Sequence, residues 1–179
     1  MTQARKDVPF SNTDAFRFCP ADGTRLGDPR PSGGATCPEC GRSWYRNSVP
    51  AVGVAIVRDG KALVTVRALE PEKGRVDVPG GFVEVGEHPV EGIEREVREE
   101  LGVEIEVQGN PALLATHTYG PGGIWVLAIS FLARIVDGEP SPADDVAEIR
   151  WVSAEEIDDL DFAWEHDRRL VRAALEDGG

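Results

Sequence analysis

Three glutamates close together in one short segment are the residues of this chain best suited to chemistry: Glu96, Glu99 and Glu100. Residues three and four apart are neighbours on a helix surface, so on a helix Glu96 would lie beside both of the others. Carboxylates crowded in this way repel one another, and a bound divalent cation would remove the repulsion. Because oxygen ligands favour Mg²⁺ or Mn²⁺ over Zn²⁺, the pattern indicates a magnesium or manganese site.

The apolar residues of the segment predict a helix from Pro89 to Leu101. They recur at three- and four-residue steps and mark one buried stripe: Val90, Ile93, Val97 and Leu101. Proline suits the first turn of a helix, and a glycine suits the position after its end. An acidic helix face is more often plain solvated surface. Here the surrounding glycines favour the metal site: Gly80, Gly81, Gly86 and Gly102.

With those glycines in place, residues 81–103 resemble the Nudix box. Five residues separate Gly81 from Glu87, and seven more lead to Arg95, after which the glutamates and Gly102 follow at the box spacing. The resemblance implies a metal-dependent hydrolase that cleaves the phosphoanhydride of a nucleoside diphosphate linked to another group. It also implies the Nudix α/β fold, an α/β/α sandwich with a mixed sheet.

The same resemblance implies roles for single box residues. The usual metal ligands would be the Gly81 carbonyl, Glu96 and Glu100, with Glu99 as a further ligand or the base that activates water. A structural ion pair that holds the loop against the helix is implied for Glu87 and Arg95. One box position, commonly alanine, is Gly92 here. Glycine costs a helix about 1 kcal/mol at such a position, so we expect close packing against a sheet.

Residues outside the box are further candidates for the site. Many Nudix enzymes bring another carboxylate to the metal or the water, and Glu148 lies at that place in the chain, with Asp144 and Asp145 as rivals. All three could equally be ordinary loop charges. Candidate substrate contacts are one phosphate ligand and two aromatic side chains that could stack on a base: Arg67, Tyr119 and Trp125. Surface charge and packing are the alternative roles for these three.

All three cysteines lie near the N-terminus, in two copies of one short motif. Cys19 begins the first copy, which has Asp22 where the second copy, from Cys37, has Cys40. The pair resembles the knuckles of a zinc ribbon, and a carboxylate can ligate zinc, which predicts one structural Zn²⁺ on three thiolates and Asp22. In the competing interpretation the ribbon has lost its metal and Asp22 only closes a turn. Three cysteines in a chain expected to be cytosolic do not favour a disulfide.

The rest of the chain predicts a zinc-ribbon-like segment over residues 1–46 and a Nudix hydrolase domain over residues 47–179. Strands alternate with two or three helices, which indicates a mixed sheet covered on both faces. The expected strands cover residues 49–57, 61–67, 76–79, 104–107, 112–118, 124–136 and 148–152. The expected helices after the box are one capped by Ser153 and a last one over residues 162–175.

Composition limits the possible partners. The net charge of −13 argues against general binding to nucleic acid. No apolar run approaches the ~20 residues needed to cross a membrane, and the first seven residues do not form a signal peptide, so we expect a cytoplasmic protein. Because Nudix relatives commonly form homodimers, we also expect a homodimer, for which residues 44–57 offer apolar strand surface.

The substrate is less well defined by the sequence. A zinc ribbon ahead of a Nudix domain resembles the NADH pyrophosphatase arrangement. The Ser-Gln-Pro-Trp-type motif of that group is not found after the box, where residues 116–121 read Thr-His-Thr-Tyr-Gly-Pro. ADP-ribose or another nucleotide sugar is therefore favoured, with NADH or an oxidised nucleoside triphosphate as alternatives. A nucleotide-sensing binding protein whose ribbon contacts a partner is a different class of function, and the intact set of glutamates argues against it.

Overall fold

The computed structural model describes residues 17–27, 34–45, 47–120 and 123–177. The chain divides into two compact units, one of residues 1–48 with 118–125 and one of residues 49–117 with 126–179. The first seven residues and part of the expected turn at Gly120–Gly123 lie outside the described residues. In the described part of the chain, no helix has both the length and the apolar character that a membrane span requires. The predicted domain boundary at residues 46–47 stays a prediction.

The larger unit is built on one seven-stranded sheet with the order β5-β4-β3-β8-β7, to which β6 and β9 add by pairing with β3 and β4. Strand β3 pairs in parallel with β8 and antiparallel with β4, so the predicted mixed sheet is confirmed. The strands are β3 (Val49–Arg58), β4 (Lys61–Arg67), β5 (Val76–Asp77), β6 (Gly80–Phe82), β7 (Glu104–Tyr119), β8 (Ile124–Asp137) and β9 (Val146–Val152).

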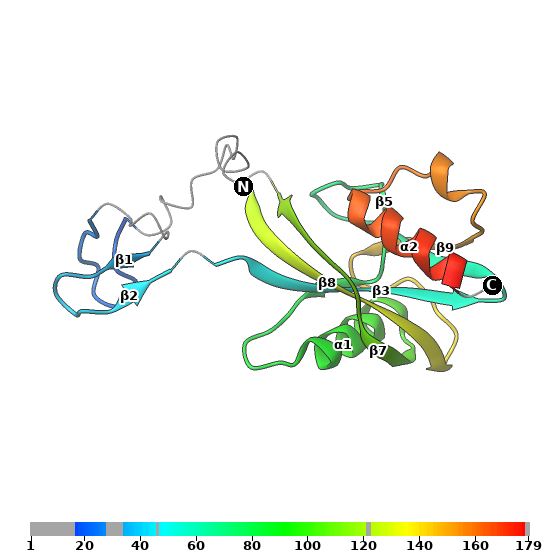
Figure 1. Cartoon of the computed structure of the whole chain (residues 1–179), viewed down its shortest axis with the longest axis horizontal. Helices are drawn as coiled ribbons and strands as arrows, with labels where there is room; N and C mark the ends of the chain where they lie inside the picture. Colours follow the sequence, from blue (N-terminus) through cyan, green and yellow to red (C-terminus); the bar gives the residue numbers. More distant parts are fainter. Residues whose placement is uncertain (1–16, 28–33, 46, 121–122, 178–179) are drawn as a thin grey trace. The chain divides into compact units, whose positions relative to one another are not determined.

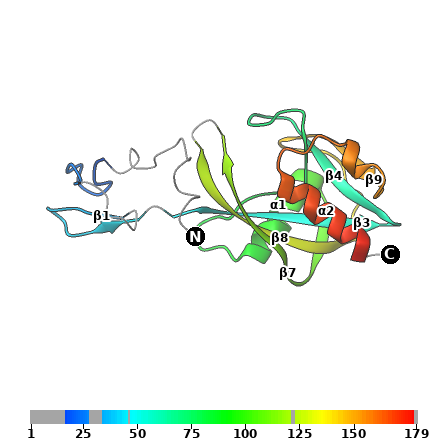
Figure 2. The same ribbon diagram turned by 45° about the horizontal axis from the view of Figure 1, so that its top comes forward.

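Two helices cover opposite faces of this sheet, α1 (Pro89–Leu101) and α2 (Glu165–Asp177) (Figure 1). The turned view in Figure 2 shows α2 lying along the sheet. Each helix encloses its own apolar core. Residues of α1 pack with Val54 and Phe131 on one face, and residues of α2 pack with Ala55 and Val64 on the other. The predicted α/β/α arrangement is therefore confirmed.

Helix α1 has the predicted limits. His88 caps its N-terminus by accepting a hydrogen bond from the Val90 N–H, while the Glu91 carboxylate accepts one from the His88 N–H. Gly102 ends it in the left-handed region, with a φ of 69°. The apolar stripe faces the core, where Ile93 and Val97 are fully buried. This orientation turns the glutamates of the last two turns toward the loop that precedes the helix.

Two expected strands and two expected helices differ from the structure. Strand β7 is one continuous strand where the sequence predicts two, with Gly109 at a φ of 68° inside it. The predicted helix after Ser153 is wrong, because only a 3-10 turn at Ile157–Asp159 forms. The last helix starts at Glu165 and not at Phe162. The backbone of Phe162 instead forms a parallel β-bridge with Val76 of β5.

The smaller unit contains a two-stranded antiparallel sheet of β1 (Ala35–Thr36) and β2 (Ser43–Trp44). Its small core consists of Cys19, Leu26, Ala35 and Cys37, with Trp44 packed against them. Two of these five residues are cysteines, so a large part of the buried surface surrounds the thiols.

Strand β3 lies inside the sheet and has Val52, Val54 and Ile56 in the core, so part of the surface expected for a dimer contact is already covered. The homodimer itself remains a prediction. Light scattering at micromolar concentration should give twice the 19.4 kDa of one chain. A species of 19.4 kDa alone would contradict it.

Candidate metal centre and active site

The loop from Val78 to Gly81 lies directly against α1. The Val54 N–H donates to the Pro79 carbonyl at 3.0 Å, which ties the loop to β3. Gly80 has a φ of +152°, and a Cβ there would lie 2.1 Å from the Val52 carbonyl oxygen, so only glycine fits. A Cβ on Gly81 would lie 2.3 Å from Glu96 Oε1. The backbone at Gly81 and the Glu96 carboxylate therefore occupy one small region, as the predicted metal ligation requires.

Glu100 is the most enclosed carboxylate of the box, with 6% of the residue exposed. Its Oε2 accepts a hydrogen bond from the Gly80 N–H at 2.9 Å. Burial raises the pKa of Glu100 well above its usual value, the Gly80 N–H opposes this, and the neighbouring charges of Asp145 and Glu96 add to it. In the part of the chain that the structure describes, no lysine or arginine pairs with Glu100. A buried carboxylate surrounded by other carboxylates fits a bound cation, because the cation would offset their repulsion.

Arg95 holds the other two glutamates of the run. Its Nη1 lies 2.9 Å from Glu96 Oε1 and 3.0 Å from Glu99 Oε2. Burial raises the pKa of Glu96, although the adjacent guanidinium of Arg95 lowers it. The Glu99 side chain is 51% exposed, so it reaches water while the enclosed Glu100 does not. This difference suits Glu99 to a proton-transfer role beside more enclosed ligands.

Glu87 and Arg95, for which the sequence predicts a structural ion pair, lie in direct contact. Arg95 Nε and Nη2 donate to the two oxygens of Glu87 at 2.8 and 3.1 Å, and Nη2 also donates to the Phe82 carbonyl at 3.1 Å. The pair binds the loop to the helix at two points. The position of Glu87 also explains why residue 92 is glycine. A Cβ there would lie 2.9 Å from Glu87 Oε2 and 3.7 Å from Val52 Cγ2 of the sheet. The expected close packing is present, with the Glu87 carboxylate as the nearest neighbour.

The loop between β8 and β9 brings a fourth carboxylate to this region. The Ser141 and Ala143 N–H groups donate to the last carbonyls of α1, those of Leu101 and Glu100, at 3.0 and 2.8 Å. The Asp145 carbonyl accepts from the Ala68 N–H at 2.7 Å. Held at both ends, Asp145 is half-buried and its charge raises the pKa of both Glu96 and Glu100.

This donor set fits a hard divalent cation. It consists only of oxygen atoms, from Gly81, Glu96, Glu99, Glu100 and Asp145, and its buried member lacks a cationic partner among the described side chains. Mg²⁺ is typically bound by one or two carboxylates together with substrate phosphates and water, so the protein need not supply a closed cage. The carboxylates are spread more widely than those of a preformed cage, since Arg95 holds two of them.

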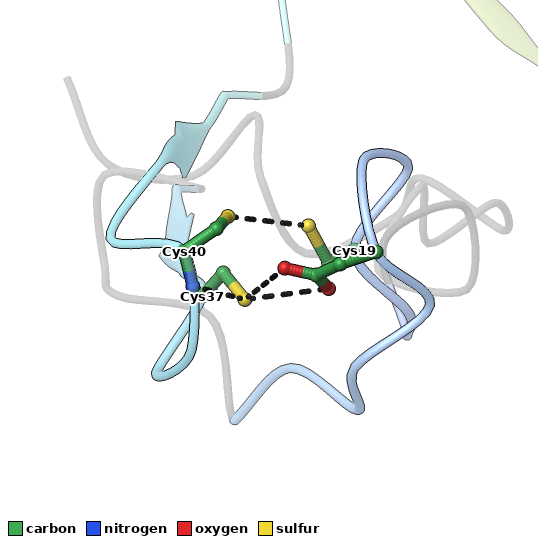
Figure 3. A group of neighbouring side chains, drawn as sticks. Cys19, Cys37 and Cys40 are labelled. Atoms are coloured by element: carbon green, nitrogen blue, oxygen red, sulfur yellow. Dashed lines mark hydrogen bonds between the residues drawn. The ribbon is translucent and has the colours of Figure 1, made fainter.

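The cysteine motifs form a separate and tighter cluster (Figure 3). The ligand atoms of Cys19, Asp22, Cys37 and Cys40 all lie within 4.8 Å of one another. Cys19 Sγ lies 3.7 Å from Cys40 Sγ, and Cys37 Sγ lies 3.4 Å from Asp22 Oδ2. A zinc tetrahedron with bonds of about 2.3 Å to sulfur and 2.1 Å to oxygen has edges of roughly 3.8 and 3.6 Å. The observed separations are close to those edges.

The two knuckles have the same backbone geometry. The Gly23 N–H donates to the Cys19 carbonyl at 2.8 Å, and the Gly41 N–H donates to the Cys37 carbonyl at 3.0 Å. The Thr24 N–H donates to Asp22 Oδ1 at 2.9 Å and is the main reason that the pKa of this carboxyl is well below its usual value. Asp22 is therefore ionised and turned toward the thiols, as a substituted ligand would be.

Comparison with known proteins identifies the family of the larger unit. The NUDIX domain model matches residues 47–174, which include every residue of the carboxylate site. The chain belongs to the Nudix family. It is a Nudix pyrophosphohydrolase with an N-terminal cysteine cluster.

Its similarity extends to Nudix proteins with different substrates. It is 32% identical over 118 residues to the ADP-ribose pyrophosphatase of Methanocaldococcus jannaschii, covering 66% of this chain and 69% of that protein. It is 31% identical over 148 residues to the NAD-capped RNA hydrolase NudC of Pseudomonas aeruginosa, covering 80% of this chain but only 50% of that protein. The chain thus spans about half the length of this NudC relative.

The chain is also similar to a putative diphosphatase and to a solved Nudix structure. The Putative 8-oxo-dGTP diphosphatase 2 of Mycobacterium tuberculosis is 34% identical over 124 residues, which cover 65% of this chain and 80% of that protein. The crystal structure of a NUDIX hydrolase from Nitrosomonas europaea is similar with a TM-score of 0.71 and 25% identity, over 89% of this chain and 90% of that one.

Glu148 and Asp145, both candidates for the additional carboxylate, have different surroundings. Glu148 is exposed on β9, where Arg150 Nε and Nη2 donate to its two oxygens at 2.8 and 2.9 Å. Those hydrogen bonds lower the pKa of Glu148. The structure favours Asp145, named from the sequence only as a rival, as the additional carboxylate beside Glu96 and Glu100.

We therefore expect Asp145→Asn to slow turnover at least about tenfold, a loss of about 1.4 kcal/mol, because it removes one negative charge beside the metal ligands. Glu148→Gln, the matched control from the next strand, should stay within about twofold, because its charge faces Arg150. Steady-state rates at saturating Mg²⁺ compare the two. A larger loss in Glu148→Gln than in Asp145→Asn would restore the assignment made from the sequence.

The three predicted substrate contacts have different surroundings. Arg67 is largely buried: its Nη1 lies 2.8 Å from Asp77 Oδ2, its Nε donates to the Pro71 carbonyl, and its guanidinium lies 5.0 Å from the centre of the Trp164 ring. These contacts suit a positioning residue. Tyr119 and Trp125 belong to the smaller unit. Their roles in substrate binding, like that of Arg67, stay predictions.

Proposed function

We propose that this Nudix hydrolase cleaves ADP-ribose or a closely related nucleoside diphosphate sugar to a nucleoside monophosphate and a sugar phosphate. The observation that carries the proposal is the complete carboxylate set around Gly81 in a chain 32% identical to an ADP-ribose pyrophosphatase. The segment after the box also lacks the Ser-Gln-Pro-Trp-type motif expected of an NADH pyrophosphatase.

The residues of the site divide the work of the reaction. The Gly81 carbonyl, Glu96 and Glu100 would hold a divalent cation, with Glu99 and Asp145 beside them. When bound, such a cation neutralises charge on the diphosphate and lowers the pKa of a coordinated water. Glu99 is the exposed carboxylate of the set, so we assign to it the acceptance of the proton from the attacking water.

Water attack on one phosphorus breaks the P–O–P bridge and leaves one phosphate monoester on each side. The proton taken by Glu99 passes to solvent, and the oxygen that leaves departs as part of the second monoester. Arg95 keeps Glu99 in place during this step through its 3.0 Å contact, while Glu87 fixes Arg95. The loop and the helix that carry the reacting groups are thereby held as one body.

A second candidate substrate is NADH or another nicotinamide dinucleotide. The observation that favours it is the cysteine cluster, together with 31% identity to NudC over 80% of this chain. Oxidised nucleoside triphosphates are a third candidate, supported by 34% identity to a putative 8-oxo-dGTP diphosphatase. A nucleotide-sensing function is less well supported, because a sensor has no need of Glu99 at an exposed position beside the buried ligands.

A substrate panel distinguishes these candidates. ADP-ribose, a UDP-sugar, NADH and 8-oxo-dGTP would each be incubated with the full chain and Mg²⁺ or Mn²⁺, and the products separated by chromatography. We expect the largest kcat/KM for ADP-ribose. A preference for NADH or 8-oxo-dGTP of more than about tenfold, a difference of 1.4 kcal/mol in transition-state binding, would replace this proposal with the corresponding alternative.

We further propose that the cysteine cluster holds one structural Zn²⁺ and takes no part in the chemistry. A structural site has four protein ligands and no open position, which three thiolates and Asp22 provide. The core of the smaller unit is too small to provide much folding free energy without metal.

A further inference from the structure

Two carboxyl groups outside the Nudix box are buried next to each other. Asp77 ends β5, four residues before Gly81, and Asp167 lies in the first turn of α2. Only 12% of the Asp77 side chain and 5% of the Asp167 side chain are exposed. The two carboxyl groups lie close enough for a hydrogen bond between them, which acts on the pKa of both. Two ionised carboxylates cannot share a hydrogen bond, since neither has a proton to donate.

The surroundings provide charge for one carboxylate and not for two. Arg67 Nη1 donates to Asp77 Oδ2 at 2.8 Å, and the Val78 N–H donates to Asp77 Oδ1 at 2.8 Å. Asp77 is therefore the better stabilised anion. Asp167 is in contact with His166, whose Nε2 lies 3.3 Å from Asp167 Oδ1, and the charge of Arg67 also acts on it.

His166 does not provide the missing positive charge. Burial lowers its pKa to about 4, and the nearby His117 and Arg169 act in the same direction. Its ring stacks on that of His117 at a centroid distance of 4.6 Å, and burial lowers the pKa of His117 as well. Both imidazoles are neutral near pH 7. Arg67 is then the cation that stabilises the two buried carboxyl groups, and its single charge balances one carboxylate.

We propose that Asp77 and Asp167 hold one proton between them, with Asp167 donating to Asp77, and that this pair positions the Val78–Gly81 loop of the metal centre. Asp167 is the acid, Asp77 the anion, and both are positioning residues because neither touches the metal ligands. The proposal rests on the Nudix metal centre and is independent of which nucleotide is the substrate.

The path from the pair to the metal centre is short. Asp77 fixes the Val78 N–H, Pro79 accepts from the Val54 N–H, and Gly80 donates to Glu100 at 2.9 Å. The charge of Asp77 also reaches Glu100 and raises the pKa of that carboxyl. A second charge on Asp167 would add to this repulsion, so the shared proton keeps the loop compatible with an ionised Glu100.

The shared proton has a consequence for stability that can be measured without substrate. Burial raises the pKa of Asp167 well above its usual value, with Asp77 adding to the shift and Arg67 opposing it. Unfolded chains release this proton near pH 4. Above that pH the folded state binds one proton more than the unfolded state, so stability falls as pH rises toward the folded pKa. The other titratable groups near the pair are His166, which contacts Asp167, and Glu100, on which the charge of Asp77 acts.

The test compares Asp167→Asn with Asp167→Ala in the full chain. Asparagine keeps a neutral N–H donor toward Asp77 and cannot ionise. We expect the difference in Tm, Asp167→Asn minus wild type, to become more positive as pH rises above about 4. We expect Mn²⁺ affinity, measured by electron paramagnetic resonance, to stay within about twofold of wild type. Asp167→Ala should lose roughly tenfold in Mn²⁺ affinity, because Asp77 loses its donor and the loop is loosened.

Asp161→Asn is the matched control, since Asp161 is an exposed carboxylate paired with Arg75 beside the same strand. It should leave both the pH profile and Mn²⁺ affinity unchanged. If Asp167→Asn were as damaging as Asp167→Ala, or if its Tm difference did not change with pH, Asp167 would act as an ionised group and the proposal would be wrong. Because neither readout uses a nucleotide, failure of the ADP-ribose proposal leaves this test intact.

Discussion

Replacing Glu100 by glutamine will lower metal-supported turnover at least about 100-fold, the size expected when a buried charge contribution to the transition state is lost. Glu100 is the enclosed carboxylate of the box and lacks a cationic partner among the described residues. Glutamine keeps the side-chain oxygen that accepts from the Gly80 N–H at 2.9 Å, so the loop should stay in place. Initial rates on the best substrate of the panel, at saturating Mg²⁺, measure the effect.

Glu94→Gln is the control for this experiment, because Glu94 lies on the same helix and outside the cluster of ligands. It should stay within about twofold of wild type. Circular dichroism and Tm should show that both variants are folded. Near wild-type turnover in Glu100→Gln would show that this carboxylate does not hold the cation, and the ligand assignment would then be wrong.

Loss of zinc will unfold the cysteine-containing segment, residues 17–45, and leave the hydrolase activity intact. Structural zinc sites contribute on the order of 10 kcal/mol or more to folding, and the core of this unit consists of only a few residues around two cysteines. We expect about one equivalent of zinc by elemental analysis of protein purified without added metal. Cys37→Ser should reduce this to less than about a tenth. Hydrolysis should return fully when Mg²⁺ is added after chelation.

The complementary variant is Asp22→Cys, which restores a four-thiolate site. Thiolate binds zinc more tightly than carboxylate, so this variant should resist chelation at least about tenfold better than wild type. Limited proteolysis of residues 17–45 reports the folding of the unit. Wild-type protein that contains no zinc and still resists proteolysis there would show that Asp22 only closes a turn through its 2.9 Å contact with the Thr24 N–H.

The sequence predicts helix α1 to the residue, because several independent signals agree there. Apolar spacing, Pro89 at the start and Gly102 at the end all indicate the same limits, and the ion pair of Glu87 with Arg95 forms as the box spacing implies. The helix expected after Ser153 fails for the opposite reason. Its capping signal is real, since the Ser153 N–H donates to Glu156 at 2.8 Å, but no apolar stripe follows to continue the helix.

The choice between Asp145 and Glu148 could not be made from sequence, because it depends on contacts between distant segments. Hydrogen bonds fix the loop before Asp145 to the end of α1, and Glu148 pairs with Arg150. The burial of Asp77 and Asp167, in contrast, is indicated by their positions in the sequence. Asp77 stands between two valines of an apolar strand, and Asp167 falls on the buried stripe of α2 with Leu170, Val171 and Ala174.

The most direct test of the proposed activity is ³¹P nuclear magnetic resonance of ADP-ribose incubated with the full chain. With Mg²⁺ present, the two diphosphate signals should be replaced by two monoester signals, those of AMP and ribose 5-phosphate. The change should stop on chelation of Mg²⁺ and should be absent with Glu100→Gln. Intact diphosphate signals after prolonged incubation with wild type and Mg²⁺, together with intact NADH and 8-oxo-dGTP under the same conditions, would contradict the account.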